Sequence, residues 1–311
     1  MARPTRLLLI DDDRLQHRVV QQMVHKFQGE PLELDWADTY AAGLKKLLGG
    51  KYAVCLLDYR LGERDGLALM REAQAARCET PIVFLTAETS TAVDHAALEA
   101  GAADYLLKNE ITLRTLERSI RYARKLGQTL SQLRQLATHD ELTGIINRRE
   151  FQRVLDEEWL RSERFKHPFA VVIADLDHFK AVNDTHGHQV GDEVLKHVAS
   201  LLAGQMRTVD RVARHGGEEF ALLMVETDRK QAVEAMKRLY ALLADMPCII
   251  PEKNLSISVT LSAGVAAMPS AASSPSDLMA IADKALYAAK KAGRNRIVTA
   301  DGKVVKPGVE N

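Results

Sequence analysis

Over about the first 125 residues, short apolar runs alternate with segments of helical spacing. The apolar runs at 7–10, 52–57, 82–85 and 104–107 are continuous rather than alternating. Continuous runs are typical of strands that are buried on both faces of a parallel sheet. The segments between them, such as 66–76 and 91–100, have the periodicity of helices. This pattern predicts a doubly wound α/β domain, in which polar residues gather beyond the carboxyl ends of the strands.

A long helix without proline is expected over residues 112–138, with Gly127 as its single weak helix former. Its apolar positions follow 3-4 spacing in two registers: Leu113, Leu116, Ile120 and Ala123, then Leu126, Leu130, Leu133 and Ala137. The spacing favours a short coiled coil that pairs two copies, with a stutter near Gly127. The alternative is a monomeric helix that packs its apolar side on the first domain.

A second mixed pattern begins at Asp140. It reads as a helix to about 165, a strand over 169–174, two helices to about 204, a strand pair around 215–217, a helix over 229–244, an alternating strand over 255–266 and a helix over 276–291. This order predicts an α+β palm-like fold in which helices cover a sheet that includes antiparallel strands. The residues after Ile297, and 301–311 in particular, are expected to form a frayed tail.

Length, charge and cysteine spacing narrow the class of protein. A chain of 311 residues has room for two domains, and 42 basic residues balance 42 acidic ones. This balance argues against a partner that is nucleic acid or an anionic membrane. Cys55, Cys78 and Cys248 lack disulfide or metal spacing. Because the chain also lacks a signal-peptide core and an apolar stretch of about 20 residues, we expect a cytosolic protein.

Polar residues end the strands of the first domain. Asp11 and Asp12 follow the first strand, Asp58 the third, Thr86 the fourth and Lys108 the fifth. Each residue alone could be a strand-end or capping group. Three carboxylates at one edge repel one another unless a divalent cation such as Mg²⁺ binds between them. Together these residues predict that Asp58 attacks a phosphoryl donor while Lys108 stabilises charge on the transferring group.

The segments IDDD, LLDYRLGERDG, FLTAET and DYLLK resemble the response-regulator receiver family over roughly residues 4–125. The resemblance implies a flavodoxin-like receiver, here residues 1–125, and a cognate histidine kinase as partner. It makes Asp58 the phosphoacceptor and assigns the other residues as follows: Asp11, Asp12 and the Arg60 carbonyl to the metal, and Thr86, Tyr105 and Lys108 to the switch. Gly62 and Asn109 stand where the family usually has proline.

A second group of polar residues follows the strand that begins at Phe169. Asp175 and Asp177 end this strand, and the Gly216-Gly217 pair predicts a hairpin that holds Glu218 beside Asp175. Such a carboxylate pair suits one or two Mg²⁺ ions on a triphosphate. Amides at the helix start after Asp177 can receive phosphate oxygens. Lys290 and Arg294, a turn apart at the end of the last helix, are expected to add cations for the outer phosphates.

The segments DELTGIINRR, DLDHFKAVNDTHGHQVGDE, RHGGEEF, LSAGVA and ADKALYAAKKAGRNR together resemble the GGDEF diguanylate cyclase family. The resemblance covers about residue 138 to the end of the last helix, and we expect a cyclase domain over 139–300 after a linker over 112–138. It implies that two GTP molecules condense to cyclic di-GMP and two pyrophosphates in a homodimer. GGEEF replaces GGDEF here but keeps a carboxylate at the third position.

The resemblance also implies roles for single residues. Asp175, the Leu176 carbonyl and Glu218 hold Mg²⁺ or Mn²⁺, Asn183 and Asp192 bind guanine, Phe179 and Lys180 lie at the phosphates, and Lys290 and Arg294 lie at the β/γ end. Asp175, Lys180 and Glu218 are the expected catalytic set. Since Asp192 can accept from the N1 and N2 donors of guanine, which adenine lacks, GTP is favoured over ATP.

An RxxD pattern precedes the hairpin. Arg207 and Asp210 stand at the offset that the family uses for an inhibitory site for the product, and Arg238 is a candidate contact from a partner domain. A surface salt bridge is the alternative explanation of this pair. Two alternatives to an active cyclase also remain: a catalytically silent module that senses cyclic di-GMP or GTP, and a receiver-controlled scaffold.

Overall fold

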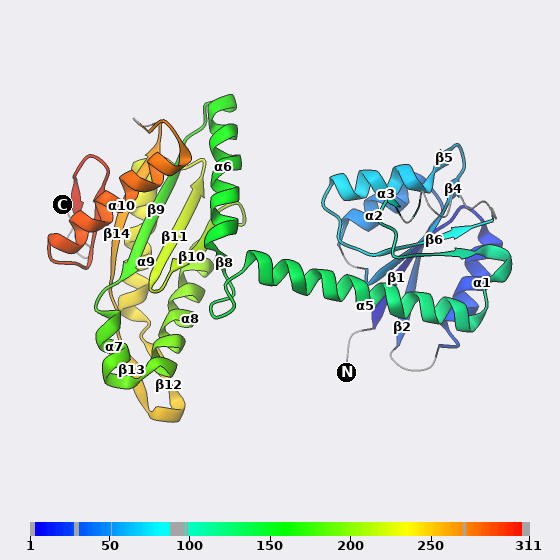
Figure 1. Ribbon diagram of the computed structural model, residues 1–311, viewed down its shortest axis with the longest axis horizontal. Coiled ribbons are helices and arrows are strands. Elements are labelled where there is room, and N and C mark those ends of the chain that lie inside the picture. The colour runs from blue at the N-terminus through cyan, green and yellow to red at the C-terminus, as the bar shows by residue number, and fades with distance from the viewer. Residues whose placement is uncertain are drawn as a thin grey trace. The chain divides into compact units, whose positions relative to one another are not determined.

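The computed structural model describes residues 4–27, 31–50, 52–87, 97, 99–269 and 272–306, and the chain divides into two compact units, Met1–Arg134 and Gln135–Asn311 (Figure 1). In the first unit, β1 (Thr5–Ile10), β2 (Leu32–Ala37), β3 (Val54–Asp58), β6 (Ile82–Thr86) and β7 (Asp104–Leu107) form a parallel sheet in the order β2-β1-β3-β6-β7. The predicted doubly wound domain is therefore confirmed.

Helices cover both faces of this sheet. They are α1 (Arg14–Val24), α2 (Tyr40–Leu48), α3 (Gly66–Ala75) and α5 (Leu113–Thr138); a small hairpin of β4 (Arg60–Leu61) and β5 (Arg64–Asp65) and the turn η1 (Lys108–Glu110) complete the described elements. Leu7 and Leu9 of β1 pack in one core cluster, whereas Leu8 and Ile10 pack in another. This alternation explains why the strand sequence is apolar throughout. Most of the helix expected over 91–100 lies outside the described residues.

The helix α5 is continuous, as predicted, but its two halves differ in burial. Leu116, Ile120 and Ala123 are buried in the cluster that contains Leu7 and Leu9. The second half carries leucines that are 44–58% exposed: Leu126, Leu130, Leu133 and Leu136. The first half thus follows the monomeric alternative, while the second half offers an apolar stripe that a coiled coil would need. Pairing of two copies remains a prediction.

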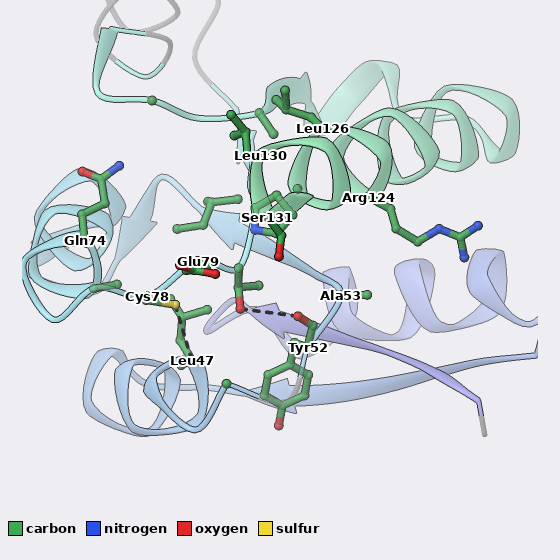
Figure 2. Close-up of a pocket in the computed structure, with 18 of the residues that line it drawn as sticks. Leu47, Tyr52, Ala53, Gln74, Cys78, Glu79, Arg124, Leu126, Leu130 and Ser131 are labelled. Atoms are coloured by element: carbon green, nitrogen blue, oxygen red, sulfur yellow. Dashed lines mark hydrogen bonds between the residues drawn. The ribbon is translucent and has the colours of Figure 1, made fainter. Parts of the chain in front are cut away.

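A cavity of about 1030 Å³ lies beside the second half of α5, within the first unit (Figure 2). Leu126 and Leu130 line it together with Leu47 from the last turn of α2 and Cys78 from the loop that leads into the amino end of β6 (Figure 2). In parallel sheets, ligands bind beyond the carboxyl ends of the strands. The cavity is therefore on the wrong edge of the sheet to be the predicted phosphorylation site.

In the second unit, seven strands form a mixed sheet in the order β16-β15-β14-β9-β11-β10-β8. Their bounds are β8 (Ile146–Asn147), β9 (Phe169–Leu176), β10 (Arg211–Gly216), β11 (Glu219–Val225), β14 (Leu261–Met268), β15 (Arg296–Thr299) and β16 (Val304–Val305). Both antiparallel and parallel ladders occur, since β9 pairs antiparallel with β11 and β14, whereas β15 runs parallel to β14. The predicted α+β palm-like class is confirmed.

Helices pack on both faces of the second sheet (Figure 1). They are α6 (Arg148–Phe165) and α10 (Pro275–Lys291) on one face, and α8 (His188–Gln205) and α9 (Arg229–Asp245) on the other, with α7 (Phe179–His186) leading into α8. A separate hairpin of β12 (Cys248–Ile250) and β13 (Leu255–Ile257) encloses η2 (Pro251–Lys253). No helix in the described part of the chain has the length and apolar composition that crossing a bilayer would require.

Three sequence-based boundaries differ from the structure. The strand expected over 255–266 is two strands, because Thr260 turns its carbonyl and hydroxyl toward Asp177 and the ladder breaks there. Residues 140–147 form a turn and β8, and the helix begins only at Arg148 with Asn147 as its N-cap. The prediction of a frayed tail after Ile297 is wrong for residues up to 306, because β15 pairs with β14 and β16 folds back on β15. Residues 307–311 lie outside the described residues.

Candidate active site

The predicted acidic cluster of the first unit is assembled at the carboxyl ends of its strands. One carboxylate oxygen from each of Asp11, Asp12 and Asp58 lies within 4.8 Å of the others. Asp11 and Asp58 are buried, whereas Asp12 is exposed. Since oxygen ligands of this kind suit Mg²⁺, the geometry fits the predicted cation site.

Lys108 lies between the two buried acids. Its Nζ is 2.9 Å from Asp11 Oδ2 and 2.8 Å from Asp58 Oδ2. Burial raises the pKa of both carboxyl groups, against the opposing effect of Lys108. Burial disfavours the charge of Lys108, but its hydrogen bonds to the two acids outweigh this and raise its pKa. The amine therefore remains a cation beside the expected phosphoacceptor.

The remaining residues of the predicted switch lie close to this cluster along the sheet. Thr86 is buried at the end of β6. Leu85, the residue before Thr86, is paired with Asp58 in the sheet. Tyr105 is half-buried on β7, next to the core cluster that contains Phe84. The amide of Arg60 donates to Asp58 Oδ1 at 3.4 Å. The strand ends thus bring Thr86 and Lys108 to the acidic cluster, whereas Tyr105 lies within β7 and packs on the core.

The second predicted site forms where the β10–β11 hairpin reaches the end of β9. Gly217 has φ +51°, in the region that favours glycine, as the hairpin prediction requires. The register places Glu219 directly opposite Asp175, and the carbonyl of Glu218 accepts from Leu176 N at 3.2 Å. Glu219 was absent from the predicted site residues. The segment RHGGEEF does contain this second glutamate, but its position opposite Asp175 depends on the register in which β9 and β11 pair.

This edge of the second sheet concentrates negative charge. Asp175 is buried, and its Oδ2 lies 2.7 Å from Lys290 Nζ. Burial raises the pKa of Asp175, while Lys290 and Arg294 act in the opposite direction. Burial and the charge of Asp175 raise the pKa of both Glu218 and Glu219. Three crowded acids and one lysine make a site that a divalent cation and a triphosphate would neutralise.

The start of α7 lies immediately after this strand end. His178, the N-cap, has φ +59° and makes no side-chain cap. The Phe179 side chain is buried in the core, so only its backbone could meet a phosphate. Lys180 is exposed. The helix start therefore leaves room for oxygens of a ligand at its amides.

The two residues expected to bind guanine come from the consecutive helices α7 and α8. A Cβ on Gly191 would lie only 1.9 Å from Asn183 Oδ1, so glycine is needed for the close approach. Asn183 Oδ1 is buried and has no hydrogen-bond partner among the residues that the structure describes. Asp192, the next residue after Gly191, is exposed on α8. An unpaired buried acceptor beside a carboxylate suits a ligand with N–H donors.

One predicted placement differs in detail. Lys290 is in the last turn of α10, but the helix ends at Lys291, so Arg294 lies in the turn that follows and not on the helix. Arg294 has φ +59°, and its amide donates to Ala289 O at 3.1 Å. Gly293 precedes it with φ +108°, and this glycine ends the helix before Arg294 is reached.

The RxxD pair is folded as a tight turn rather than as an ion pair. Asp210 accepts from the backbone amides of Arg207, at 3.0 Å, and Val225, also at 3.0 Å. The Arg207 side chain is exposed, and Arg238 is exposed on α9. Asp210 therefore shapes the turn that presents Arg207, and both arginines are accessible to a ligand.

Comparison with known families matches both units. The model of the diguanylate cyclase GGDEF domain matches residues 137–296, and the model of the response regulator receiver domain matches residues 7–121. The response regulator PleD of Caulobacter vibrioides is 30% identical over 302 residues, which cover 94% of this chain and 65% of PleD. The chain thus spans slightly less than two thirds of that relative. The probable diguanylate cyclase DgcC of Escherichia coli is 38% identical over 179 residues, covering 57% of this chain and 47% of DgcC.

Solved structures of GGDEF domains resemble more than half of this chain. The coiled coil and GGDEF domain of DgcB from Caulobacter crescentus, in complex with c-di-GMP, aligns with a TM-score of 0.56 and 31% identity, covering 60% of this chain and 97% of that one. The GGDEF domain of DgcB alone, also with c-di-GMP, aligns with a TM-score of 0.51 and 33% identity, covering 53% and 97%.

Proposed function

The chain belongs to the GGDEF diguanylate cyclase family and carries a response-regulator receiver domain, and we propose on this basis that it condenses two GTP molecules into cyclic di-GMP and two pyrophosphates. The observation that carries the proposal is the edge of the second sheet, where Asp175, Glu218 and Glu219 face Lys290. A catalytically silent module would be expected to lack carboxylates here, whereas this chain keeps them.

The acids at this edge fit Mg²⁺ or Mn²⁺. They supply hard oxygen ligands. The pKa of Glu218 and of Glu219 is raised by burial and then by the charge of Asp175, and a cation would relieve the second of these effects. We assign Asp175, the Leu176 carbonyl and Glu218 to the metal, with Glu219 as a further carboxylate. Bound metal would neutralise the triphosphate and make the α-phosphate more electrophilic.

The protein groups around the metal site bind and orient GTP. Asn183 Oδ1 accepts from the base, and Asp192 accepts from the guanine N1 and N2 donors, which selects against adenine. Lys180 and the backbone at Phe179 hold the phosphates at the start of α7. Lys290 exchanges its contact with Asp175 for the outer phosphates, where Arg294 also binds. Asp175, Glu218 and Lys180 then act on the reacting groups.

Two copies are needed because one domain holds one GTP. Each 3′-hydroxyl attacks the α-phosphate of the other nucleotide, so the two sites must face each other. The exposed leucines of α5, Leu126, Leu130 and Leu133, offer a surface for this pairing, as does the likeness to a solved coiled coil and GGDEF domain. We propose a homodimer that forms through this helix.

The receiver domain supplies regulation. We propose that a cognate histidine kinase provides the phosphoryl group for Asp58, with Asp11, Asp12 and the Arg60 carbonyl at a metal, and that Thr86, Tyr105 and Lys108 respond to it. The phosphoryl group adds a charge of about −1.5 to −2 next to Lys108.

The product would supply a second form of regulation. Cyclic di-GMP would inhibit the cyclase reaction by binding at Arg207 and Asp210, with Arg238 as a second contact. The free cysteines support a reducing cytosol as the place of action.

One experiment tests the proposed reaction directly. The purified protein is incubated with GTP and Mg²⁺, and the product is identified by mass spectrometry. We expect cyclic di-GMP and pyrophosphate, and no product from ATP. Tight GTP binding without any product, in a sample that also binds cyclic di-GMP, would instead favour the silent sensing module.

A further inference from the structure

Asp177 is a buried acid that the proposed chemistry leaves without a role. It follows β9 directly, is 5% exposed and lies two residues beyond Asp175. Three donors converge on its carboxylate: Thr260 Oγ1 donates to Oδ2 at 2.7 Å, Asn295 N donates to Oδ2 at 2.9 Å, and Ser262 Oγ donates to Oδ1 at 2.7 Å. Both oxygens are thus engaged by protein groups, and Asp177 is not available as a metal ligand alongside Asp175.

These hydrogen bonds join three separate parts of the second unit. Asp177 directly follows β9, Thr260 directly precedes β14, Ser262 lies at the start of β14, and Asn295 lies in the turn after α10. The amide of Asp177 also donates to the Thr260 carbonyl at 2.9 Å. The Asp177 side chain is therefore one of the contacts that fix the turn after α10 relative to the strand that carries Asp175.

The turn held in this way contains Arg294. Arg294 and Asn295 have φ +59° and +44°. Asparagine adopts this left-handed conformation fairly readily, but for arginine it is costly and persists where the surroundings fix it. The hydrogen bond from Asn295 N to Asp177 is one such constraint. Without it, the turn would keep the backbone hydrogen bonds of Arg294 with Ala289 and Arg296 but would lose its hydrogen bond to the residue that follows β9.

We infer that Asp177 is a positioning residue, which directs Arg294 to the outer phosphates of GTP. The inference rests on the proposed function, since it takes the β/γ end of the triphosphate as the ligand of Arg294. It deepens that function by assigning part of the triphosphate affinity to a side chain that touches neither metal nor nucleotide.

Substitutions at Asp177 differ in which hydrogen bonds they keep. Asp177→Ala removes the acceptors of all three donors. Asp177→Asn keeps one oxygen, and because the hydroxyl of Ser262 can reverse to accept from the new amide group, Asn295 N retains its partner. The asparagine variant should therefore recover most of the affinity that the alanine variant loses.

Binding of 3′-deoxy-GTP and of GMP, each measured by calorimetry with Mg²⁺, separates the two ends of the nucleotide. The first lacks the attacking hydroxyl and cannot condense, and the second lacks the outer phosphates. We expect Arg294→Ala and Asp177→Ala each to weaken the binding of 3′-deoxy-GTP by about tenfold, which is the loss expected for one charge-assisted contact. The double variant should bind this nucleotide no more weakly than either single variant. GMP should bind equally to all of them.

A matched control removes a different buried acid. Glu158 is 4% exposed on α6, outside the proposed site, and Glu158→Ala should leave the affinity for 3′-deoxy-GTP unchanged. Additive losses from Asp177→Ala and Arg294→Ala, or an equal loss of GMP binding, would overturn the inference. A wild-type protein that binds neither nucleotide would refute the proposed function instead.

If circular dichroism shows that Asp177→Ala does not fold, the pair Thr260→Val and Ser262→Ala replaces it. Together these changes remove the hydroxyl donors that hold the carboxylate toward Asn295. They should weaken the binding of 3′-deoxy-GTP when Arg294 is present, but they should have no effect on it in the Arg294→Ala variant. No effect in the first background, or the same effect in both, contradicts the positioning role.

Discussion

Arg214 on β10 connects Asp140, in the turn after α5, to the hairpin that carries Glu218. Its Nη1 lies 3.2 Å from Asp140 Oδ1 and 3.3 Å from Oδ2, and its Nε donates to Gly217 O at 2.9 Å. Asp140 also accepts from the amide and hydroxyl of Thr143. The end of the long helix is thus linked to the residue before Glu218 by one guanidinium, entirely within the second unit.

Replacing Arg214 by lysine should lower catalysis without unfolding the domain. Lysine keeps the charge but cannot hold Asp140 and the Gly217 carbonyl with fixed geometry. Since small errors in the position of a catalytic group are costly, we expect kcat to fall by about ten- to a hundredfold. Arg153→Lys, in an exposed ion pair on α6, is the control. Wild-type kcat in Arg214→Lys would show that the hairpin does not depend on this link.

The carboxylates of the hairpin should be essential. Glu218→Gln and Glu219→Gln each remove a negative charge beside Asp175, and we expect cyclic di-GMP formation to fall by at least about a hundredfold. Melting curves should show an intact fold. Glu226→Gln, exposed just beyond the other end of β11, is a matched change that should keep its activity. Normal turnover in Glu218→Gln would remove the proposed mechanism.

Phosphorylation should act through Asp58. Beryllofluoride, a phosphoryl mimic, is expected to raise turnover or self-association of the wild type, because the added charge pulls Lys108 from its contacts with Asp11 and Asp58. Asp58→Asn should not respond. Sedimentation and turnover, measured with and without the mimic, test this. Equal responses in both proteins would indicate a different input.

Arg207→Ala should relieve inhibition by the product. The exposed guanidinium can stack on guanine and donate to it, and we expect the inhibitory concentration of cyclic di-GMP to rise by about tenfold or more. Arg207 is a cleaner target than Asp210, because the Asp210 carboxylate also holds two backbone amides. Lys237→Ala, on α9, serves as a charge control. An unchanged inhibition curve would refute the site.

Glu158 should make stability depend on pH. Burial raises the pKa of this carboxyl, although His167 and Arg161 act in the opposite direction. Because the folded pKa is above the unfolded one, the folded state is favoured at low pH, and this advantage is lost as pH rises through the folded pKa. Glu158→Gln stays neutral, so it should be more stable than the wild type at neutral pH.

Urea unfolding at several pH values checks the Glu158 prediction. The difference in unfolding free energy between the two proteins should shrink as pH falls to about 4, where the wild-type carboxyl also becomes neutral. A difference that stays constant from acid to neutral pH would show that ionisation of Glu158 is not its cause.

The linear sequence determined the classes of both folds and pointed to most of the acidic residues of both candidate sites, although not to Glu219. Continuous apolar runs marked the strands of the first sheet, and Asp58, Asp175 and Glu218 stood at strand ends or in a glycine hairpin. Periodicity and turn chemistry are local properties, so a single sequence carries them. The membership of both families follows from the same segments and is confirmed by the matches over residues 7–121 and 137–296.

Only the tertiary structure decided which side chains meet. Glu219 opposite Asp175 depends on strand register, Arg214 with Asp140 joins residues 74 positions apart, and Asn295 with Asp177 joins residues 118 positions apart. No local pattern encodes such pairs, because they arise when separate elements pack on one sheet. The division of α5 into a buried and an exposed half has the same origin: both halves carry the same apolar spacing, and the sheet beneath covers only the first.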